Sequence, residues 1–354
     1  MALARHRAGL SKKGLAQALS LHPRTLSRWE MDEREPGEDE LRSLSDFLGF
    51  SEQFFLAGEC DTANADSASF RSMSSMSAKE RDSALASGSL GFIAFDWIEA
   101  NYNLPECDID DLGHETPEAA ARSLRERWLI GEKPISHMIK LLESKGVRVC
   151  SLAENARSVD AFSLWRAEKP YVFLNSLKTA EHQRFDAAHE LGHLVLHRHG
   201  SSKGREAEHE ANRFASAFLM PAADVKATLP MVLGINTMIR TKKRWRVSLA
   251  ALNYRLHRLG ITSEWEYRGY CIDIQKRGYR SSEPDGIEKE RSEIWQRVFA
   301  DLKESQTSKT DFARQLGVPA KEIDNLVFGL VSMLPLEGGG KRVQSTKPDL
   351  KLVK

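Results

Sequence analysis

One five-residue segment, His189-Glu190-Leu191-Gly192-His193, constrains the fold of this chain most strongly. Residues four positions apart on an α-helix lie about 40° apart on one face, so the two imidazoles can converge on one point if the segment is helical. Apolar residues around the segment favour such a helix: Phe185, Ala188, Leu191 and Val195. Gly192 would let a neighbouring segment approach closely, at a cost of about 1 kcal/mol relative to alanine.

Two histidines in this arrangement indicate zinc chemistry. A catalytic zinc usually has three protein ligands and one open position, so one ligand is needed besides His189 and His193. Zinc lowers the pKa of water toward 7, and Glu190 could accept the proton during attack on a peptide carbonyl. Because such a motif also occurs by chance, the surrounding residues must show whether it is a metal site. We expect the third ligand on the next predicted helix, residues 205–215.

That helix resembles the arrangement in glutamate zincins, a class of zinc peptidases in which a glutamate is followed four residues later by a polar residue. The resemblance implies Glu208 as the third ligand, with Glu210 as the main rival and His209 as a weaker one. It also implies that Asn212 orients the first histidine through a hydrogen bond. His197 lies one turn beyond His193 on the same face, and we expect it to cap the helix or support a ligand.

Length and composition limit the possible architectures. At 354 residues, the chain is longer than one hydrophobic core usually supports, so we expect several domains. No apolar run approaches the roughly 18 residues that span a bilayer. The N-terminus also lacks the apolar stretch of a secretory signal, so we predict a cytoplasmic protein without membrane contact. The four cysteines form no CxxC pair, which argues against a thiolate zinc site: Cys60, Cys107, Cys150 and Cys271.

Charge is segregated within the first domain, where residues 1–28 contain six lysines and arginines and no acid. Residues 22–30 predict a helix with Pro23 in its first turn and with Leu26 and Trp29 facing inward. Its outward side chains are Arg24, Thr25, Ser27 and Arg28. Arginines bind guanine edges or phosphates, and hydroxyls bind either. We therefore predict that these four side chains contact double-stranded operator DNA, although a solvated helical face has the same composition.

The pattern of residues 14–19, 24–30 and 41–55 resembles the XRE-type family of phage-repressor helix-turn-helix domains. The resemblance implies a DNA-binding domain over residues 1–58. Ser20 and Asp32 stand where that family usually has glycine, so we expect some backbone strain in both turns.

The remaining residues predict an α+β domain and further helices. Helical spacing recurs at 78–101, 117–128 and 135–145, and strand patterns at 147–150, 161–165 and 171–175 predict a small antiparallel sheet. The expected fold is multidomain, with an all-α helix-turn-helix domain, a zincin-like α+β domain and a helical C-terminal region. The predicted boundaries are 1–58 for the DNA-binding domain, 59–79 for a serine- and alanine-rich linker, 80–222 for the zincin-like domain, 223–265 for a helical bundle, 266–335 for a helical region with a possible second helix-turn-helix, and 336–354 for a disordered tail.

The metal motif, residues 208–215 and the segment Phe218-Leu219-Met220-Pro221 together resemble the ImmA/IrrE family of metallopeptidases, in which a repressor-type domain often precedes the peptidase. The resemblance implies a zinc-dependent endopeptidase that cleaves a partner transcriptional repressor and so derepresses mobile-element or stress-response genes. The alternative is a regulator or antitoxin-like factor whose zinc-binding domain senses a signal without cleavage. A homodimer is possible in either case. Tyr254 and His257 are weak candidates for stabilising an oxyanion.

Overall fold

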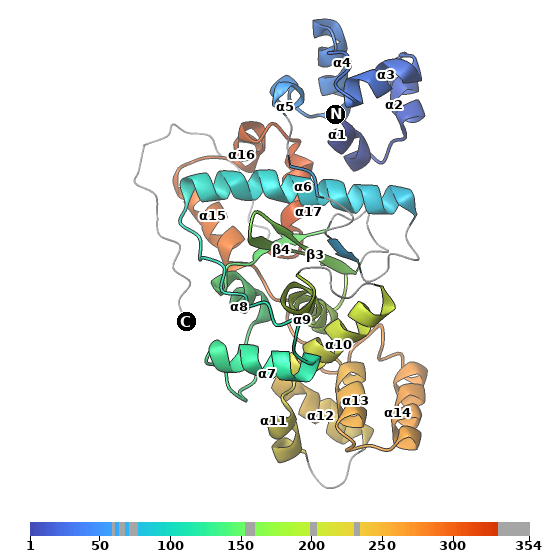
Figure 1. The fold of residues 1–354 in the computed structure, drawn as a ribbon, viewed down its shortest axis with the longest axis vertical. Helices are drawn as coiled ribbons and strands as arrows, with labels where there is room; N and C mark the ends of the chain where they lie inside the picture. The colour runs from blue at the N-terminus through green and yellow to red at the C-terminus, as the bar shows by residue number, and fades with distance from the viewer. Residues whose placement is uncertain are drawn as a thin grey trace. The chain divides into compact units, whose positions relative to one another are not determined.

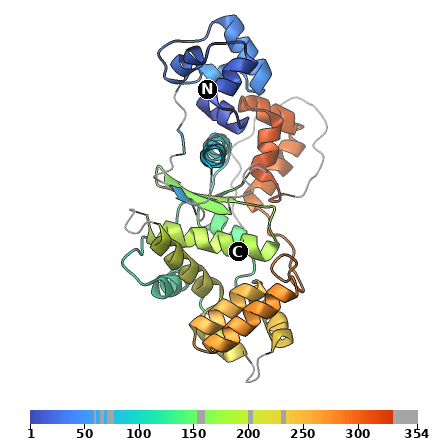
Figure 2. The same ribbon diagram turned by 90° about the vertical axis from the view of Figure 1, so that its right-hand side faces the viewer.

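The computed structural model describes residues 1–58, 61–63, 68–70, 77–152, 160–198, 204–229 and 234–331. Contacts between residues divide the chain into two compact units, whose elements are drawn in Figures 1 and 2. The terminal unit comprises Met1–Pro105, Cys150–Asp160 and Glu293–Lys354, and the central unit comprises Glu106–Val149 and Ala161–Ser292. The predicted DNA-facing helix lies in the terminal unit, and the metal motif lies in the central unit.

Five short helices begin the terminal unit: α1 (Ala2–Arg7), α2 (Lys12–Ala18), α3 (Pro23–Glu30), α4 (Glu38–Leu48) and α5 (Glu52–Leu56). Their core consists of Leu15, Ala16, Leu26, Trp29 and Leu44. The Ser11 hydroxyl caps α2 by accepting a hydrogen bond from the backbone N–H of Gly14 at 3.0 Å. Ser20 and Asp32 have φ angles of 55° and 54°, so both turns use the left-handed conformation that glycine adopts most easily, as the sequence predicted.

The rest of the terminal unit is built around the long helix α6 (Ala78–Asn101), together with β1 (Ala68–Phe70), α15 (Glu293–Glu304), α16 (Lys309–Gln315) and α17 (Ala320–Val327). A capping box fixes the start of α6, because Ser77 and Glu80 exchange hydrogen bonds. α6 packs against both α1 and α17. Arg7 of α1 is buried and contacts both α17 and α6. Its guanidinium donates to Glu322 Oε2 of α17 at 2.5 and 2.8 Å and to Ser87 Oγ of α6 at 2.6 Å.

The C-terminal helices α16 and α17 are joined by a tight turn in which Gly317 has a φ of 70°. The Gly317 carbonyl accepts a hydrogen bond from the Ser51 N–H at 2.9 Å, which links this turn to the N-terminal helices. On α17, Glu322 and Ile323 are buried. The predicted disordered tail, residues 336–354, lies outside the described residues.

The three predicted strands form as β2 (Arg148–Ser151), β3 (Ala161–Arg166) and β4 (Lys169–Leu174). β3 and β4 lie in the central unit, and β2 begins in the central unit and ends in the terminal unit. β3 and β4 pair antiparallel, and Phe162 opposes Phe173 with ring centroids 4.6 Å apart. Ala167 and Glu168 between them both have positive φ, as a two-residue type I′ hairpin turn requires. The predicted fold class is thus confirmed: N-terminal helices, a small sheet with helices, and C-terminal helices.

Helices α9 (Ala180–Leu196) and α10 (Arg205–Leu219) carry the metal motif and its predicted partner. α9 packs against β3 and β4 and also against α10, so it is buried along nearly its whole length. Gly192 permits the close approach of α10: a Cβ atom there would lie 3.2 Å from the Ala211 Cα and 3.1 Å from the Phe214 ring. The sequence predicted this role for Gly192.

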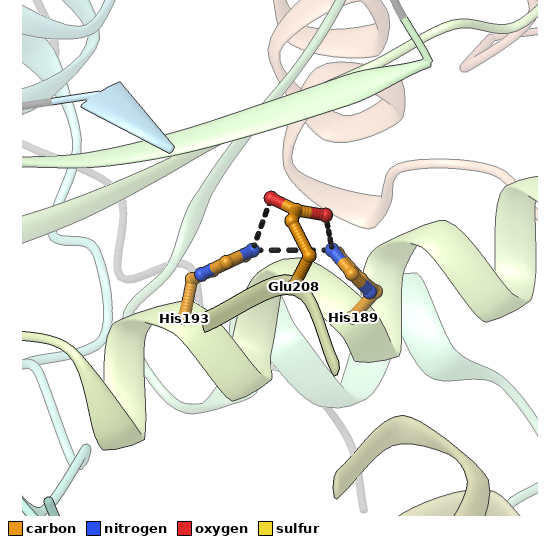
Figure 3. Close-up of side chains that lie close together, drawn as sticks. All are labelled: His189, His193 and Glu208. Atoms are coloured by element: carbon orange, nitrogen blue, oxygen red, sulfur yellow. Dashed lines mark hydrogen bonds and ion pairs between the residues drawn. The ribbon is translucent and has the colours of Figure 1, made fainter. Parts of the chain in front are cut away.

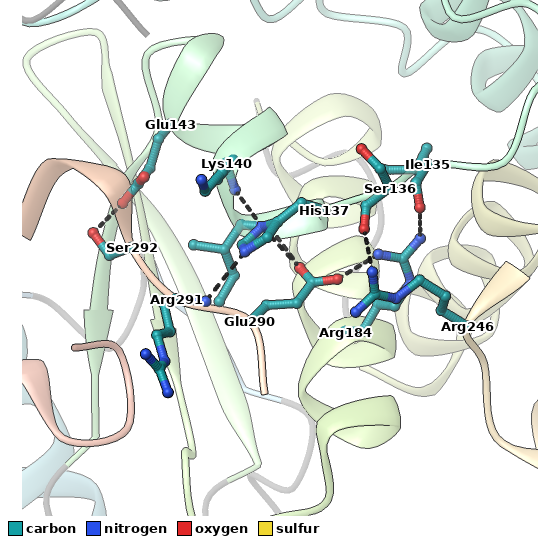
Figure 4. Close-up of polar contacts among 11 residues, drawn as sticks. Ile135, Ser136, His137, Lys140, Glu143, Arg184, Arg246, Glu290, Arg291 and Ser292 are labelled. Carbon is teal, nitrogen blue, oxygen red and sulfur yellow. Dashed lines mark hydrogen bonds and ion pairs between the residues drawn. The ribbon is translucent and has the colours of Figure 1, made fainter. Parts of the chain in front are cut away.

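Six further helices complete the described part of the central unit: α7 (Pro117–Arg127), α8 (Met138–Ser144), α11 (Ala222–Thr228), α12 (Ile235–Trp245), α13 (Leu249–Arg258) and α14 (Glu264–Lys276). A buried ion pair holds the N-terminal half of α9, because Arg184 Nη1 lies 2.5 Å from Glu290 Oε1 (Figure 4). Arg184 also donates to the Ile135 carbonyl, and Glu290 Oε2 accepts the Ile139 N–H at 3.0 Å. The segment before α15 and the start of α8 therefore fix α9 in place.

Candidate metal centre

His189 and His193 lie one turn apart on α9 and direct their rings toward the same point. Their Nε2 atoms are 3.1 Å apart, and the ring planes meet edge to face. His189 is 0% exposed and His193 is 6% exposed, so surrounding protein atoms restrict the orientation of both rings. Convergence on Nε2 is what binding to a shared metal ion requires.

Glu208, in the first turn of α10, completes the cluster (Figure 3). Its Oε2 lies 3.3 Å from His189 Nε2, and its Oε1 lies 3.4 Å from His193 Nε2. Burial alone would raise the pKa of Glu208, but the hydrogen bonds from His189 and His193 outweigh burial and hold this pKa well below its ordinary value. The carboxylate is therefore negatively charged beside two imidazoles.

The spacing of these three donors fits a zinc ion. Ligand atoms at about 2.0–2.1 Å from a tetrahedral zinc lie about 3.3 Å from one another. The three closest separations here are 3.1, 3.3 and 3.4 Å. Two imidazoles and one carboxylate are also a set of ligands found in zinc peptidases. Within the described residues, these three form the group of His, Cys, Asp and Glu side chains that could hold a metal ion.

Glu190 is fully buried on the side of α9 that faces the sheet. Ser163 of β3 donates a hydrogen bond from Oγ to Glu190 Oε2 at 2.7 Å. Ser163 was not singled out in the sequence, where it is the one hydroxyl in the apolar run Ala161-Phe162-Ser163-Leu164-Trp165. A buried hydroxyl needs a hydrogen-bond partner, and this requirement is the sequence signal that could have identified Ser163.

The other polar residues of α10 that were considered in the sequence do not contact the three clustered side chains through their own side chains. Glu210, the rival ligand, lies 2.9 Å from His197 Nε2 instead, through its Oε2. Glu206 and His209 are exposed. Asn212 donates to the Glu208 carbonyl at 2.7 Å within its own helix, so the predicted contact with the first histidine is replaced by a backbone contact.

His197 is the C-cap residue of α9, and its ring lies behind His193. The two Nδ1 atoms are 3.0 Å apart. Burial lowers the pKa of His197, and the hydrogen bond with Glu210 opposes that shift without cancelling it. Elsewhere in the central unit, His257 stacks on Tyr267 and pairs with Glu264 at 3.1 Å.

The predicted DNA-facing side chains lie on α3 of the terminal unit. Arg24 and Arg28 are exposed, and Thr25 and Ser27 are half-buried. The helix begins at Pro23, and the His22 ring caps it by accepting the Arg24 N–H at 3.2 Å. Arg28 has only a long contact with Glu33, at 3.8 Å, so its guanidinium remains accessible to a ligand.

Two of the six basic residues in 1–28 do not contribute to such a surface. Arg5 is buried and forms a two-point ion pair with Glu30, at 2.7 and 3.1 Å. Arg7 is buried against Glu322. The net charge of residues 1–28 therefore overstates the number of basic side chains that can contact DNA. A count of charges does not reveal which of them are buried in ion pairs.

Comparison with known protein families agrees with this geometry. Residues 142–257 match the model of the IrrE N-terminal-like domain, a metallopeptidase family, and residues 1–55 match a helix-turn-helix model. The chain combines an IrrE N-terminal-like domain with a helix-turn-helix domain. The family resemblance inferred from the motifs is thus confirmed. A search among curated proteins found no match.

The IrrE N-terminal-like match spans β2 to α13 and so includes α9 and α10, whereas α14 to α17 lie outside both matches. The helix-turn-helix match covers α1 to α4 and most of α5, and it includes every predicted DNA-facing residue. In the described parts of the chain, no helix is both long and apolar enough to span a bilayer.

Proposed function

We propose that this chain is a DNA-binding, zinc-dependent endopeptidase that cleaves a partner transcriptional repressor and thereby derepresses mobile-element or stress-response genes. The observation that carries the proposal is the convergence of His189 Nε2, His193 Nε2 and the Glu208 carboxylate, which are spaced like ligands of one zinc ion. The metallopeptidase family match supports the reaction class, and the helix-turn-helix match supports the DNA-binding part.

In this proposal, His189, His193 and Glu208 hold zinc. When bound, zinc supplies a Lewis acid and lowers the pKa of water. Glu190 is the general base, and it later returns the proton to the leaving amine nitrogen. The hydrogen bond from Ser163 Oγ holds Glu190 Oε2 at 2.7 Å and so fixes the plane of the carboxylate before substrate arrives. A base held in this way loses no energy to reorientation during the reaction.

DNA binding would bring the peptidase to the operator that the repressor occupies, or would regulate the chain's own gene. Arg24 and Arg28 are placed to contact phosphates or guanine edges, and Thr25 and Ser27 offer hydroxyls on the same helix. A repressor bound nearby would then be present at a high local concentration.

The experiment uses the purified full-length protein loaded with zinc and incubated with the repressor encoded beside its gene. We expect about one zinc per chain by elemental analysis, none in His189→Ala, and a full complement in Glu190→Gln. The wild-type protein should cleave the repressor under inducing conditions, and Glu190→Gln should not. Equal cleavage by both proteins would contradict the assignment of Glu190 and of the zinc site as the source of activity.

The complete burial of Glu190, at 0% exposure, favours one alternative, a regulator that binds zinc as a signal and does not cleave. A general base must meet a water molecule, and a carboxylate closed off by protein does so only after a rearrangement. The same experiment separates the two functions: full zinc binding without cleavage by the wild-type protein, together with zinc-dependent DNA binding, would favour the sensor.

A further inference from the structure

Two residues behind His193 have no role in the proposed reaction, yet they form a continuous polar chain with it. His193 Nδ1 lies 3.0 Å from His197 Nδ1, and His197 Nε2 lies 2.9 Å from Glu210 Oε2. The His197 side chain is only 8% exposed, whereas that of Glu210 is 33% exposed. The chain therefore runs from the buried metal cluster to a carboxylate that remains partly hydrated.

The donor and acceptor chemistry of these groups limits where the protons can lie. A carboxylate accepts hydrogen bonds only, so the His197 Nε2 atom beside Glu210 carries a proton. The contact between the two Nδ1 atoms can hold one proton, because two N–H groups would repel each other. If His197 is neutral, its Nδ1 accepts and His193 Nδ1 donates. With Nδ1 protonated in this way, His193 would bind a metal ion through the lone pair of Nε2, and the ion would replace the hydrogen bond from Nε2 to Glu208.

We propose that Glu210 and His197 act as a positioning relay that fixes the tautomer and ring orientation of His193 for binding a divalent metal ion. A histidine that binds a metal usually donates its other N–H to a carboxylate, a carbonyl or water. Here the acceptor is a second imidazole, whose own tautomer is set by a carboxylate. This inference rests on the proposed zinc site and adds the residues that prepare one of its ligands.

The relay explains why Glu210 does not contact His193 directly. A carboxylate buried next to Glu208 would place two negative charges in a site of low polarity, where they would repel each other and lose the stabilisation that water provides. With a neutral imidazole between them, the acceptor beside His193 adds no charge to the cluster. The negative charge of Glu210 stays at a partly exposed position, where water still solvates it.

The test measures zinc affinity by competition with a chromophoric chelator, so no substrate is needed. His197→Phe keeps a planar aromatic ring and removes both nitrogens, and we expect zinc to bind about 10–100-fold more weakly. His197→Asn restores a side-chain oxygen near the Nδ1 position and should recover part of the loss. The matched control is His209→Phe, an exposed histidine beside Glu210 on α10, which should bind zinc like the wild type.

A double-mutant cycle tests whether Glu210 acts through His197. Glu210→Gln should weaken zinc binding about tenfold in the wild-type background and should have no further effect in His197→Phe, because the second link is already gone. Nitrogen-15 NMR of the histidine side chains of the zinc-loaded protein should show His193 with a protonated Nδ1 and its metal at Nε2. A purely structural role for His197 would not produce these two results.

The outcomes distinguish failure of the relay from failure of the proposed zinc site. Wild-type zinc affinity in His197→Phe, additive losses in the cycle, or a metal-bound Nδ1 on His193 would overturn the relay and leave the proposed zinc peptidase intact, provided that His189→Ala still abolishes zinc binding. A folded wild-type protein that binds no zinc would overturn both. Circular dichroism of the metal-free variants identifies any that fail to fold. If His197→Phe does not fold, the zinc affinity of His197→Asn, compared with that of the wild type, tests the relay instead.

Discussion

Helices α9 and α3 each carry the polar side chains of one proposed activity, and each is anchored by an arginine–glutamate ion pair with little solvent exposure. On α9, Arg184 pairs with Glu290 at 2.5 Å. On α3, Glu30 pairs with Arg5 at 2.7 Å. In both cases the partner comes from outside the helix, so the ion pair fixes the position of the helix rather than only its fold.

The two helices differ in how they present their polar side chains. On α9, His189 and Glu190 are fully buried, and other side chains fix their orientation. On α3, Arg24 and Arg28 project into solvent. A metal site needs ligands placed within a few tenths of an ångström, whereas attraction to a phosphate backbone tolerates mobile cations. The difference predicts that substitutions around α9 affect stability and chemistry together, while those on α3 affect binding alone.

The largest effect should come from breaking the anchor of α9. Glu290→Ala leaves the Arg184 guanidinium buried without its ion-pair partner, and we expect a loss of about 3–5 kcal/mol in the free energy of unfolding. Urea denaturation followed by tryptophan fluorescence measures it. Glu288→Ala, at an exposed position of the same segment, is the control and should change stability by less than about 0.5 kcal/mol. A loss below 1 kcal/mol for Glu290→Ala would contradict the anchoring role.

The next effect concerns the ligand contributed by α10. Glu208→Gln removes the negative charge from the cluster, and we expect zinc affinity to fall by more than about 100-fold, beyond the range typical of residues that only orient a ligand. Chelator competition measures the affinity. Glu206→Gln, exposed in the same helical turn, should have no effect. If both variants bind zinc equally, Glu208 is not a ligand.

A smaller effect should follow from filling the space at Gly192. Alanine there would press on Ala211 and Phe214, displacing α10 and with it Glu208. We expect a loss of about 1–3 kcal/mol in unfolding free energy and weaker zinc binding. Gly269→Ala is the matched control, because Gly269 lies within α14 with no atom within 4 Å of its added Cβ. That variant should gain up to about 1 kcal/mol. Equal changes in the two variants would show that close packing at Gly192 is unimportant.

Periodicity in the sequence was sufficient to predict α3, α9 and the three strands, because burial of one face imposes a local repeat. Contacts between distant segments were not predictable in this way. Arg7 meets Glu322 across 315 positions, so its charge could not be subtracted from the basic surface in advance. Likewise, the partnership of His197 with Glu210 depends on the angle at which α10 crosses α9. The predicted domain boundaries and the roles of the site residues remain predictions.

A modest effect on turnover tests how Glu190 is held. Ser163→Ala removes the hydrogen bond to Glu190 Oε2, and we expect kcat on the repressor to fall about tenfold, or about 1.4 kcal/mol, with KM and zinc affinity unchanged. Ser216→Ala is the matched control, since this serine is also buried in the central unit and its hydroxyl has no hydrogen-bond partner there. Equal kcat values for the two variants would remove Ser163 from the mechanism.

The smallest change in stability, and the clearest contrast with α9, is expected on α3. Arg24→Ala and Arg28→Ala should each leave the unfolding free energy within about 0.5 kcal/mol of the wild type, because both side chains are exposed. Each should nevertheless weaken binding to operator DNA, and each lost phosphate contact should reduce the slope of log affinity against log salt by about 0.9. Arg42→Ala on α4, whose side chain is 65% exposed, is the control for removing a positive charge elsewhere in the domain. Fluorescence anisotropy over a salt series measures both quantities. If Arg42→Ala lowers affinity and slope as much as the α3 variants do, then DNA responds to the overall charge of the domain, and α3 has no special role in binding.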